Sequence, residues 1–565
     1  MTEEHASGAG AAPRSAGPGS GPGWSGLRPS GLAPYPVANL RSLLPLGAVP
    51  EVGDLTVSGI THDSRQVRPG DLYAALPGAV THGARFIDAA VGAGAAAVLT
   101  DEEGAEIAGW AAPDTPAGGS VSGAVPMIVV DHPRAWLGGI AAAVYRHPAH
   151  DLLMLGVTGT NGKTTTAYLL ESGLRHAGYV TGMIGTVEIR VGDEVVPSVR
   201  TTPEATDMQA ILAVMRERGI QACVMEVSSH ALAFGRADGI SYDVAGFTNL
   251  SRDHLDFHTD LEDYFGAKAR LFSVRRSRQA VICVDDTHGR RLAAEVEIPV
   301  VTVATASSGG PAPAASSAAA SAPGPAADPR AGWRVQRGEV TRLVDGGRSV
   351  ELQVPLPGDF NVANSALAVV MLVQAGVDPE VAAAGVGRCP GVPGRMEQVR
   401  VDDPDAPMMV VDYAHTPDAI ENVLRALRSQ TPGRPAGRLV VVTGAGGNRD
   451  RDKRPLMGAA AARNADVVIV TDDNPRLEHP PEIRAAVLAG AERISEEERA
   501  EVVEVADRRA AIRAALARAH GPQDTVVVLG KGHEPGQEIG GTVHPFDDRD
   551  VLREEHLDKI GRHGE

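Results

Sequence analysis

The sequence predicts an α/β protein of three domains, and three observations support this prediction. The chain has 565 residues, enough for several domains of roughly 100–200 residues each. Near its middle, an apolar run that begins at Leu152 is followed by a glycine-rich turn and a helical pattern, the order typical of a strand, phosphate loop and helix. After residue 392, runs of β-branched residues alternate with helical patterns, which is typical of a parallel sheet covered on both faces.

The N-terminal part divides into a tail and a small domain. Residues 1–36 are rich in Gly, Pro, Ser and Ala, and they lack the basic start and apolar run of a signal peptide. We interpret them as a disordered tail. Residues 37–131 alternate short apolar runs with Gly and Pro turns, which predicts a small N-terminal α/β domain.

Composition narrows the class of protein. The formal net charge of −18 argues against a surface that binds nucleic acid or anionic membranes. The three cysteines lack CxxC spacing, so they indicate neither a disulfide framework nor a zinc site. No uncharged apolar stretch reaches the ~18 residues that a membrane-spanning helix needs. We therefore expect a cytoplasmic protein with no nucleic-acid partner and no membrane insertion. We also expect a monomer, although composition leaves the oligomeric state open.

Residues 132–391 are predicted to form a central, P-loop ATPase-like α/β domain with a mostly parallel sheet. Its loop reads Thr158-Gly-Thr-Asn-Gly-Lys-Thr-Thr, although Val157 stands where the common motif has Gly. Backbone amides of such a loop surround phosphate oxygens, while Lys163 can reach the β- and γ-phosphates and the Thr164 hydroxyl can bind Mg²⁺. We expect ATP to contact Gly159, Thr160, Asn161, Gly162, Lys163, Thr164 and Thr165.

A carboxylate interrupts the next apolar strand of this domain. Glu226 lies near the end of the run that begins at Ala222. A buried carboxylate needs a partner, and a metal ion is a natural one. An ion pair inside the fold is the alternative.

The predicted helix after His254 also places a charged residue, Lys268, among apolar ones. Lys268 shares one helical face with three apolar residues, Leu261, Phe265 and Phe272. Burial would lower its pKa and leave a neutral amine that can react with CO₂ to form a metal-binding carbamate. Alternatively, the side chain extends along apolar surface and its ammonium reaches solvent. Spacing alone leaves both open.

Residues 392–565 are predicted to form a C-terminal Rossmann-like α/β domain. Its four apolar runs begin near Met408, Leu439, Asp466 and Thr525, and a polar cluster follows each run. Open α/β sheets bind ligands at that edge. Before this domain, residues 305–332 are rich in Ala, Ser, Pro and Gly, which predicts a flexible surface insertion.

Taken in order, these motifs closely resemble the Mur ligase family, the ATP-dependent amino-acid ligases of peptidoglycan precursor synthesis. The resemblance extends from about Val37 to the end of the chain, apart from the insertion. It implies that Lys268 is an N6-carboxylysine, formed with CO₂, which places Mg²⁺ together with Thr164, Glu226 and His254. It implies catalytic roles for Lys163, Glu226, His254 and Lys268. Further ATP contacts are implied for Asn361, Asn364, Arg395 and Asp412.

The resemblance also implies the substrates. UDP-MurNAc-L-Ala-D-Glu would bind with its uridine end near Ser64 and with contacts from Thr201, Thr202, Ser228 and Arg236. The other substrate is diaminopimelate, because the cluster Asp473-Asn-Pro-Arg matches the family's signature for it. Its second carboxylate suits an arginine fork, whereas the terminal ammonium of lysine would be repelled. Implied contacts are Arg449, Asp473, Asn474, Pro475, Arg476, Gly530 and Glu534.

The implied reaction has two steps, and other functions stay open beside it. ATP would phosphorylate the γ-carboxyl of D-Glu, and the amine of meso- or LL-diaminopimelate would then attack the acyl phosphate. An L-lysine-adding Mur ligase and a folylpolyglutamate synthetase-like ligase use the same chemistry, although the full N-terminal domain argues against the synthetase. A P-loop switch ATPase would instead use hydrolysis to change conformation, and it would not need an arginine-lined amino-acid pocket.

Overall fold

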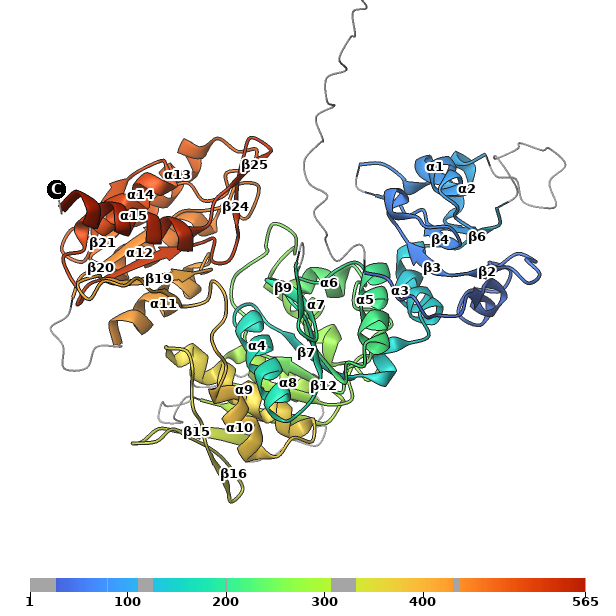
Figure 1. Ribbon diagram of the computed structural model, residues 1–565, viewed down its shortest axis with the longest axis horizontal. Helices are drawn as coiled ribbons and strands as arrows, with labels where there is room; N and C mark the ends of the chain where they lie inside the picture. Colours follow the sequence, from blue (N-terminus) through green and yellow to red (C-terminus); the bar gives the residue numbers. More distant parts are fainter. Residues whose placement is uncertain are drawn as a thin grey trace, which may run out of the picture.

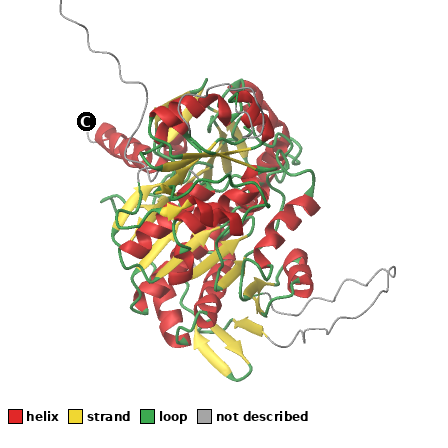
Figure 2. Cartoon of the chain, turned by 90° about the vertical axis from the view of Figure 1, so that its right-hand side faces the viewer, coloured by secondary structure: helices red, strands yellow, loops and turns green. Residues whose placement is uncertain are grey.

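The computed structural model describes residues 27–78, 80–109, 125–198, 201–305, 332–429 and 437–563. Figure 1 shows three lobes in chain order, with the N-terminal lobe in blue, the central one in green and yellow and the C-terminal one in orange and red. The turned view in Figure 2 shows strands layered between helices. The predicted three-domain α/β fold is confirmed. None of the described helices is long and apolar enough to cross a membrane.

The N-terminal lobe is built on a four-stranded parallel sheet. Its order is β3 (Gly59–Thr61), β4 (Asp71–Ala74), β5 (Ala97–Thr100) and β6 (Met127–Val129). Short helices flank this sheet, and a two-stranded ribbon lies beside it: α1 (Ile87–Gly92), α2 (Glu102–Ile107), and β1 (Tyr35–Pro36) paired with β2 (Thr56–Val57).

Part of the expected disordered tail, residues 27–36, belongs to the described structure. Residues 1–26 of the expected tail lie outside the described part, but residues 27–36 make specific contacts. The Arg28 guanidinium lies 2.7 Å from the buried Asp71 carboxylate, and Tyr35 is buried in β1. Predicting disorder through residue 36 was wrong, because composition does not show that one arginine and one aromatic ring find distant partners.

The central lobe contains an eleven-stranded sheet. Its order is β10 (Glu194–Pro197), β9 (Glu188–Val191), β8 (Thr181–Ile184), β11 (Ala222–Glu226), β7 (Leu153–Thr158), β12 (Val244–Phe247), β13 (Ala280–Cys283), β14 (Val300–Ala304), β15 (Gly332–Gln336), β16 (Arg342–Asp345) and β17 (Arg348–Glu351). The run from β8 to β15 is parallel, and the four strands outside it are antiparallel. Residues 306–331 of the expected insertion lie outside the described residues.

Both faces of this sheet are covered, which explains its continuous apolar runs. Val224 and Met225 on β11 belong to separate core clusters on opposite faces. The helices of this lobe are α3 (Pro133–Val144), α4 (Lys163–His176), α5 (Ala205–Glu217), α6 (Ser229–Ala233), α7 (Leu261–Ala269), α8 (Thr287–Glu295), α9 (Asp359–Gln374) and α10 (Pro379–Gly387). Of these, α3 packs Leu137 and Ile140 into the core of the N-terminal lobe.

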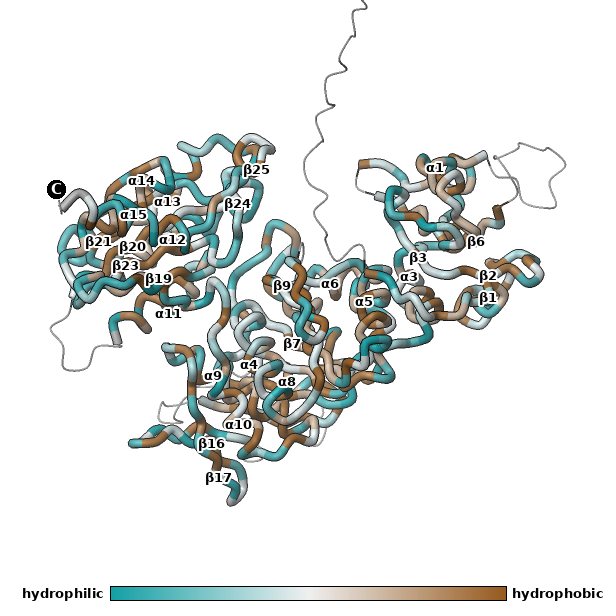
Figure 3. The backbone as a smooth tube through the Cα atoms, in the orientation of Figure 1, coloured by the Kyte–Doolittle hydropathy of each residue, from teal (hydrophilic) through white to brown (hydrophobic). Residues whose placement is uncertain are grey.

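The C-terminal lobe has a six-stranded sheet that contains all four predicted runs. The order is β18 (Glu397–Val399), β19 (Met408–Asp412), β23 (Thr525–Leu529), β20 (Leu439–Thr443), β21 (Val467–Val470) and β22 (Glu501–Glu504). Figure 3 shows apolar residues concentrated on its inner strands. Only β18 is antiparallel. Around it lie α11 (Pro417–Ser429), α12 (Lys453–Asn464), α13 (Pro480–Ala491), α14 (Arg508–Arg518), α15 (Asp548–His563) and the hairpin of β24 (Gly536–Ile539) and β25 (Thr542–Pro545).

Candidate active site

The phosphate loop lies between β7 and the first turn of α4, as the sequence predicts. Gly159 and Gly162 have φ values of +146° and +88°, and a Cβ there would meet Thr248 Oγ1 at 1.9 Å or Asn364 Oδ1 at 2.3 Å. These two positions therefore require glycine. The Lys163 Nζ donates to the carbonyls of Gly159 and Thr160 at 2.9 and 2.8 Å, and desolvation lowers the pKa of this lysine.

Glu226 is fully buried at the end of β11, directly beside the loop. Its carboxylate accepts from the Thr164 hydroxyl at 2.8 Å and from the amide and hydroxyl of Thr186 at 2.7 and 3.0 Å. The Arg395 guanidinium in turn donates to the Thr164 hydroxyl at 3.2 Å. The direct donors to Glu226 are thus neutral groups, which leaves its negative charge available for a cation.

Lys268 points into the protein, which decides between the two positions that its helical spacing left open. It is 1% exposed, and its Nζ donates to the Gly159 carbonyl at 2.7 Å and lies 4.4 Å from the centre of the Tyr264 ring. Desolvation holds the pKa of Lys268 well below its usual value. The alternative of an ammonium that reaches solvent is therefore wrong. Leu261 is 38% exposed and does not share the buried face, because it lies in the first turn of α7.

His254 lies on a loop across the same cavity. Its backbone is left-handed, with φ of 56°, and its Nε2 lies 3.4 Å from the Asp253 carboxylate. Burial lowers the pKa of His254 to about 3. Within the described residues, no three His, Cys, Asp or Glu side chains stand close enough together to hold a metal ion. Glu226 and His254 would need a further donor, and Lys268 lines the same cavity.

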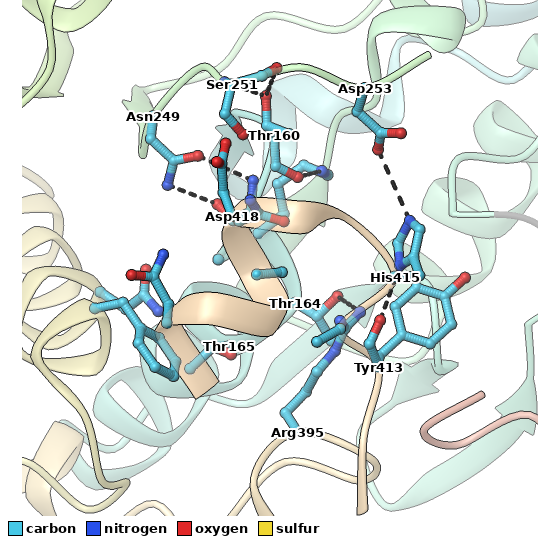
Figure 4. Close-up of a pocket in the computed structure, with 18 of the residues that line it drawn as sticks. Thr160, Thr164, Thr165, Asn249, Ser251, Asp253, Arg395, Tyr413, His415 and Asp418 are labelled. Carbon is cyan, nitrogen blue, oxygen red and sulfur yellow. Dashed lines mark hydrogen bonds and ion pairs between the residues drawn. The ribbon is translucent and has the colours of Figure 1, made fainter. Parts of the chain in front are cut away.

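A cavity of about 520 Å³ joins these groups to residues at the edge of the C-terminal lobe. Figure 4 shows Arg395 reaching toward Thr164, with Tyr413 and His415 nearby. The Arg395 guanidinium lies 4.3 Å from the centre of the Tyr413 ring. The predicted site residues that line this cavity are Thr160, Asn161, Gly162, Lys163, Thr164, Thr165, Thr201, Glu226, Ser228, His254, Lys268, Asn361, Asn364, Arg395 and Asp412.

Three of the predicted residues that line this cavity are held by hydrogen bonds within the protein. The Asn361 side-chain Nδ2 donates to the Pro357 carbonyl at 2.7 Å, and the Asn364 Nδ2 donates to Asn361 Oδ1 at 3.1 Å. The Asp412 carboxylate accepts from the Met396 and Ala414 amides at 2.7 Å each. Burial nevertheless raises the pKa of Asp412. Hydrogen bonds within the protein therefore hold these three side chains in position.

A second cavity, of about 780 Å³, opens beside the first and collects the predicted amino-acid contacts Arg449, Asp473, Asn474, Arg476, Gly530 and Glu534. The Asn474 amide donates to the Glu534 carboxylate at 2.8 Å. Arg476 is left-handed, with φ of 55°, and its guanidinium donates to the Gly447 carbonyl at 2.9 Å. The two cavities share the lining residues Thr186, Thr201, Asp253, His254, Tyr413 and His415.

Five predicted residues line neither cavity: Ser64, Gly159, Thr202, Arg236 and Pro475. Gly159 and Pro475 belong to loops whose neighbours do line the cavities. The buried Thr202 hydroxyl donates to the Glu226 carbonyl at 3.0 Å, and Arg236 forms a 2.9 Å ion pair with Glu204. Ser64 begins a short 3₁₀ helix on the N-terminal lobe.

The structure adds a contact between lobes that the sequence does not indicate. Asp253 is 5% exposed, and its carboxylate lies 3.2 Å from Lys453 Nζ and 3.8 Å from His415 Nε2. Asp253 comes from the central lobe, whereas Lys453 and His415 come from the C-terminal one. Asp253 lies next to the predicted residue His254, and His415 lies in the same polar cluster as the predicted Asp412. Sequence spacing cannot show that these two clusters meet.

Family models match three consecutive parts of the chain. The description "Mur ligase family, catalytic domain" covers residues 56–145, "Mur ligase middle domain" covers 157–372, and "Mur ligase, glutamate ligase domain" covers 394–532. Together these regions include every residue that lines the two cavities except Pro393, His533, Glu534, Pro535 and Arg549.

Curated relatives match over nearly their whole length. The UDP-N-acetylmuramoyl-L-alanyl-D-glutamate--2,6-diaminopimelate ligase of Streptomyces coelicolor is 53% identical over 534 residues, which cover 93% of this chain and 97% of that protein. The protein of the same name from Corynebacterium efficiens is 47% identical, with 89% of this chain and 90% of the relative covered.

Solved structures share the fold of this chain. A structure of UDP-N-acetylmuramoyl-L-alanyl-D-glutamate--2,6-diaminopimelate ligase is 30% identical, with a TM-score of 0.58, and the match covers 92% of this chain and 99% of that one. Escherichia coli FolC, with 18% identity and a TM-score of 0.53, covers 75% of this chain and shares the fold. The family models and the curated relatives show that the chain belongs to the Mur ligase family.

Proposed function

We propose that this chain is the ATP-dependent ligase that joins diaminopimelate to the D-Glu γ-carboxyl of UDP-MurNAc-L-Ala-D-Glu in peptidoglycan precursor synthesis. The observation that carries the proposal is the shared wall of the two cavities. One cavity surrounds the phosphate loop, and the other contains the arginines and carboxylates suited to an amino acid. A carboxyl group activated in the first would therefore lie within reach of an amine held in the second. The names of the relatives with 44–53% identity agree with this assignment.

In this proposal the phosphate loop prepares the γ-phosphoryl group for transfer. Lys163 exchanges its contacts with the loop carbonyls for phosphate oxygens, and the loop amides bind the same phosphates. Arg395 reaches the same region from the start of the C-terminal lobe. Phosphoryl transfer depends mainly on such positioning and charge neutralisation. The γ-carboxylate oxygen of D-Glu accepts the phosphoryl group, and ADP leaves.

We propose that Thr164, Glu226, His254 and Lys268 hold Mg²⁺, with Lys268 as a carbamate. Glu226 supplies a buried carboxylate that has no direct ion pair with any described residue, and His254 is held in its neutral form by burial. The Lys268 amine is desolvated, which favours the neutral nucleophile that adds to CO₂. Its carbamate would add oxygen donors to those of Thr164 and Glu226. Bound Mg²⁺ would neutralise charge on the phosphates.

The second step joins the amine to the activated carboxyl. We propose that Arg449 and Arg476 bind the distal carboxylate of diaminopimelate, while Asp473 and Glu534 accept hydrogen bonds from ammonium groups. The free amine then attacks the acyl phosphate carbon, and inorganic phosphate leaves as the amide forms. Asn474 and Pro475 shape the loop that carries Asp473 and Arg476, and Gly530 leaves room beside Asp473.

The remaining substrate contacts follow the length of the sugar nucleotide. We propose that Thr201, Thr202, Ser228 and Arg236 contact its peptide and sugar portion at the central lobe. Ser64 would contact the uridine end on the N-terminal lobe. One chain supplies both cavities, so we propose a monomer as the active unit, and we place the reaction in the cytoplasm because that compartment supplies ATP.

The test is a product assay with the purified full chain. ATP, Mg²⁺ and UDP-MurNAc-L-Ala-D-Glu are incubated with meso-diaminopimelate, LL-diaminopimelate, L-lysine or no amine, and phosphate release is measured together with product mass. We expect phosphate and a new tripeptide mass only with a diaminopimelate. Equal or better use of L-lysine would replace the assignment by a lysine-adding ligase. Amine-independent phosphate release with no new mass would favour a switch ATPase.

A further inference from the structure

The hairpin of β24 and β25 is bonded directly to the loop that carries the proposed diaminopimelate contacts. The Arg476 amide donates to the Glu538 carbonyl at 2.9 Å, and the Gly540 amide donates to the Arg476 carbonyl at 2.7 Å. The Glu538 amide donates to Asn474 Oδ1 at 2.9 Å. The left-handed conformation of Arg476 is thus held by the hairpin from both sides.

One side chain of this hairpin connects it to the end of β21. Gln537 is 8% exposed, and its Nε2 donates to the Asp473 carbonyl at 2.8 Å and to the Asp472 carbonyl at 3.3 Å. Gln537 does not line either cavity. Its two hydrogen bonds fix the backbone at the residue whose carboxylate does line the amino-acid cavity. The side chain therefore acts on the pocket only through the loop.

A fully buried arginine, Arg508, also donates hydrogen bonds to this part of the lobe. Arg508 Nη1 donates to the Asp472 carbonyl at 3.4 Å, and Nη2 donates to the Leu529 carbonyl at 3.0 Å. Two 2.7 Å bonds to the buried Asp548 carboxylate hold the guanidinium in place. Leu529 directly precedes Gly530, so Arg508 joins the two strand ends from which the pocket is built.

We propose that Gln537 is a positioning residue for the amino-acid substrate, which holds the Asp472–Arg476 loop in its binding conformation against the framework provided by Arg508. The inference rests on the proposed function, because it concerns the amine pocket of that reaction. The side chain donates to two backbone carbonyls of the loop from the hairpin side, and it lines neither cavity. Losing it releases the loop and lowers affinity for the amine, while the ATP cavity is unaffected.

The experiment compares the wild type with Gln537→Glu and Gln537→Met in the full chain. The new carboxylate of Gln537→Glu keeps the shape but faces two carbonyls, so it repels them when ionised and donates one hydrogen bond when protonated. We expect the KM for diaminopimelate to rise roughly tenfold at pH 8.5, with the KM values for ATP and the sugar nucleotide unchanged. The ratio of variant to wild-type KM should fall as the pH is lowered to 6.

Gln537→Met removes both donors at nearly constant volume, so its KM ratio should be raised and independent of pH. Gln398→Glu, on the exposed side of β18, is the matched control and should leave all three KM values unchanged. The uncharged Met variant keeps the test decisive if the Glu variant fails to fold.

The inference is overturned if both folded variants keep the wild-type KM for diaminopimelate, or if the KM values of all three substrates rise together. Failure of the proposed function looks different, because the wild-type protein itself would then make no diaminopimelate adduct. An elevated KM for the amine alone, with the pH response restricted to Gln537→Glu, supports the positioning role.

Discussion

The phosphate loop and the amine pocket are built in opposite ways. The loop takes its ligand-binding groups from one continuous segment between β7 and α4, and its own carbonyls satisfy Lys163. The pocket collects its groups from three separate loops of the C-terminal lobe, around Arg449, Asp473–Arg476 and Gly530–Glu534. Those loops lie far apart in the chain, and the parallel sheet brings them together at one edge.

This difference determines how substitutions at each site affect the reaction. The loop conformation depends on glycines whose missing side chains let Thr248 and Asn364 approach. The pocket depends on long-range hydrogen bonds, such as the one between Asn474 and Glu534 at 2.8 Å. We therefore expect substitutions around the phosphate loop to act on turnover, and substitutions around the amine pocket to act mainly on the binding of one substrate.

The largest expected effect is that of Lys268→Ala, at the phosphate side. The alanine removes both the contact with the Gly159 carbonyl and the proposed carbamate, so kcat should fall by roughly 10²–10³-fold. Added formate or acetate should restore part of the activity of this variant, because a small carboxylate can occupy the vacated space. Steady-state phosphate release measures both effects.

Lys163→Ala is the control for that rescue. It removes a phosphate-binding ammonium, which a carboxylate cannot replace, so added acetate should not restore its activity. Near-normal turnover of Lys268→Ala without added carboxylate would contradict the carbamate proposal.

Arg476→Lys tests the amine side of the comparison. Lysine keeps the positive charge but loses the planar fork, so the KM for diaminopimelate should rise roughly 10–100-fold, while kcat and the KM for ATP change little. Arg451→Lys, at an arginine that is 71% exposed and paired with Glu478, is the matched control and should be neutral. A comparable rise in the KM for ATP would mean that the two sites are not separable in this way.

The same contrast explains how much the sequence predicted. The parallel sheets and the phosphate loop follow from local patterns, since strand runs and glycine spacing are short-range properties. Helical spacing placed Lys268 on the apolar face of its helix but left open whether its amine is buried, and the structure decides this. The contact of Asp253 with Lys453 and the support of the amine loop by Gln537 do not follow, because nothing in either segment indicates its partner. The edge strand β22, Glu-Val-Val-Glu, was also missed, since its pattern is short and charged at both ends.

Gly530→Ala should have a moderate effect on the amine pocket. The residue has φ of +111°, and an added Cβ would lie 2.1 Å from the Asp473 carboxylate, so the free energy of unfolding should fall by about 1–3 kcal/mol. The KM for diaminopimelate should rise as Asp473 is displaced. Gly540→Ala also has a positive φ, of +58°, but open space around it. A smaller loss in that control would separate the steric contact from backbone strain, whereas equal losses would show that the contact with Asp473 is unimportant.

The smallest expected effect concerns the acid sensitivity of the C-terminal lobe. Burial, together with the charges of Arg395 and Arg549, lowers the pKa of His533 to about 3. An unfolded histidine has a pKa of about 6.5, so the unfolded chain binds more protons between these values. The stability that comes from the neutral buried imidazole is thus present above pH ~6.5 and is lost as the pH falls toward 3. Between pH 7 and 5.5 the loss is about 1 kcal/mol, or about 2–4 °C in Tm.

His533→Gln should remove most of this loss, and His544→Gln, at an exposed position on β25, should leave it unchanged. Identical slopes of Tm against pH for the wild type and His533→Gln would mean that water reaches the imidazole in the amine pocket. The pocket would then be preorganised by its hydrogen bonds and would still be hydrated.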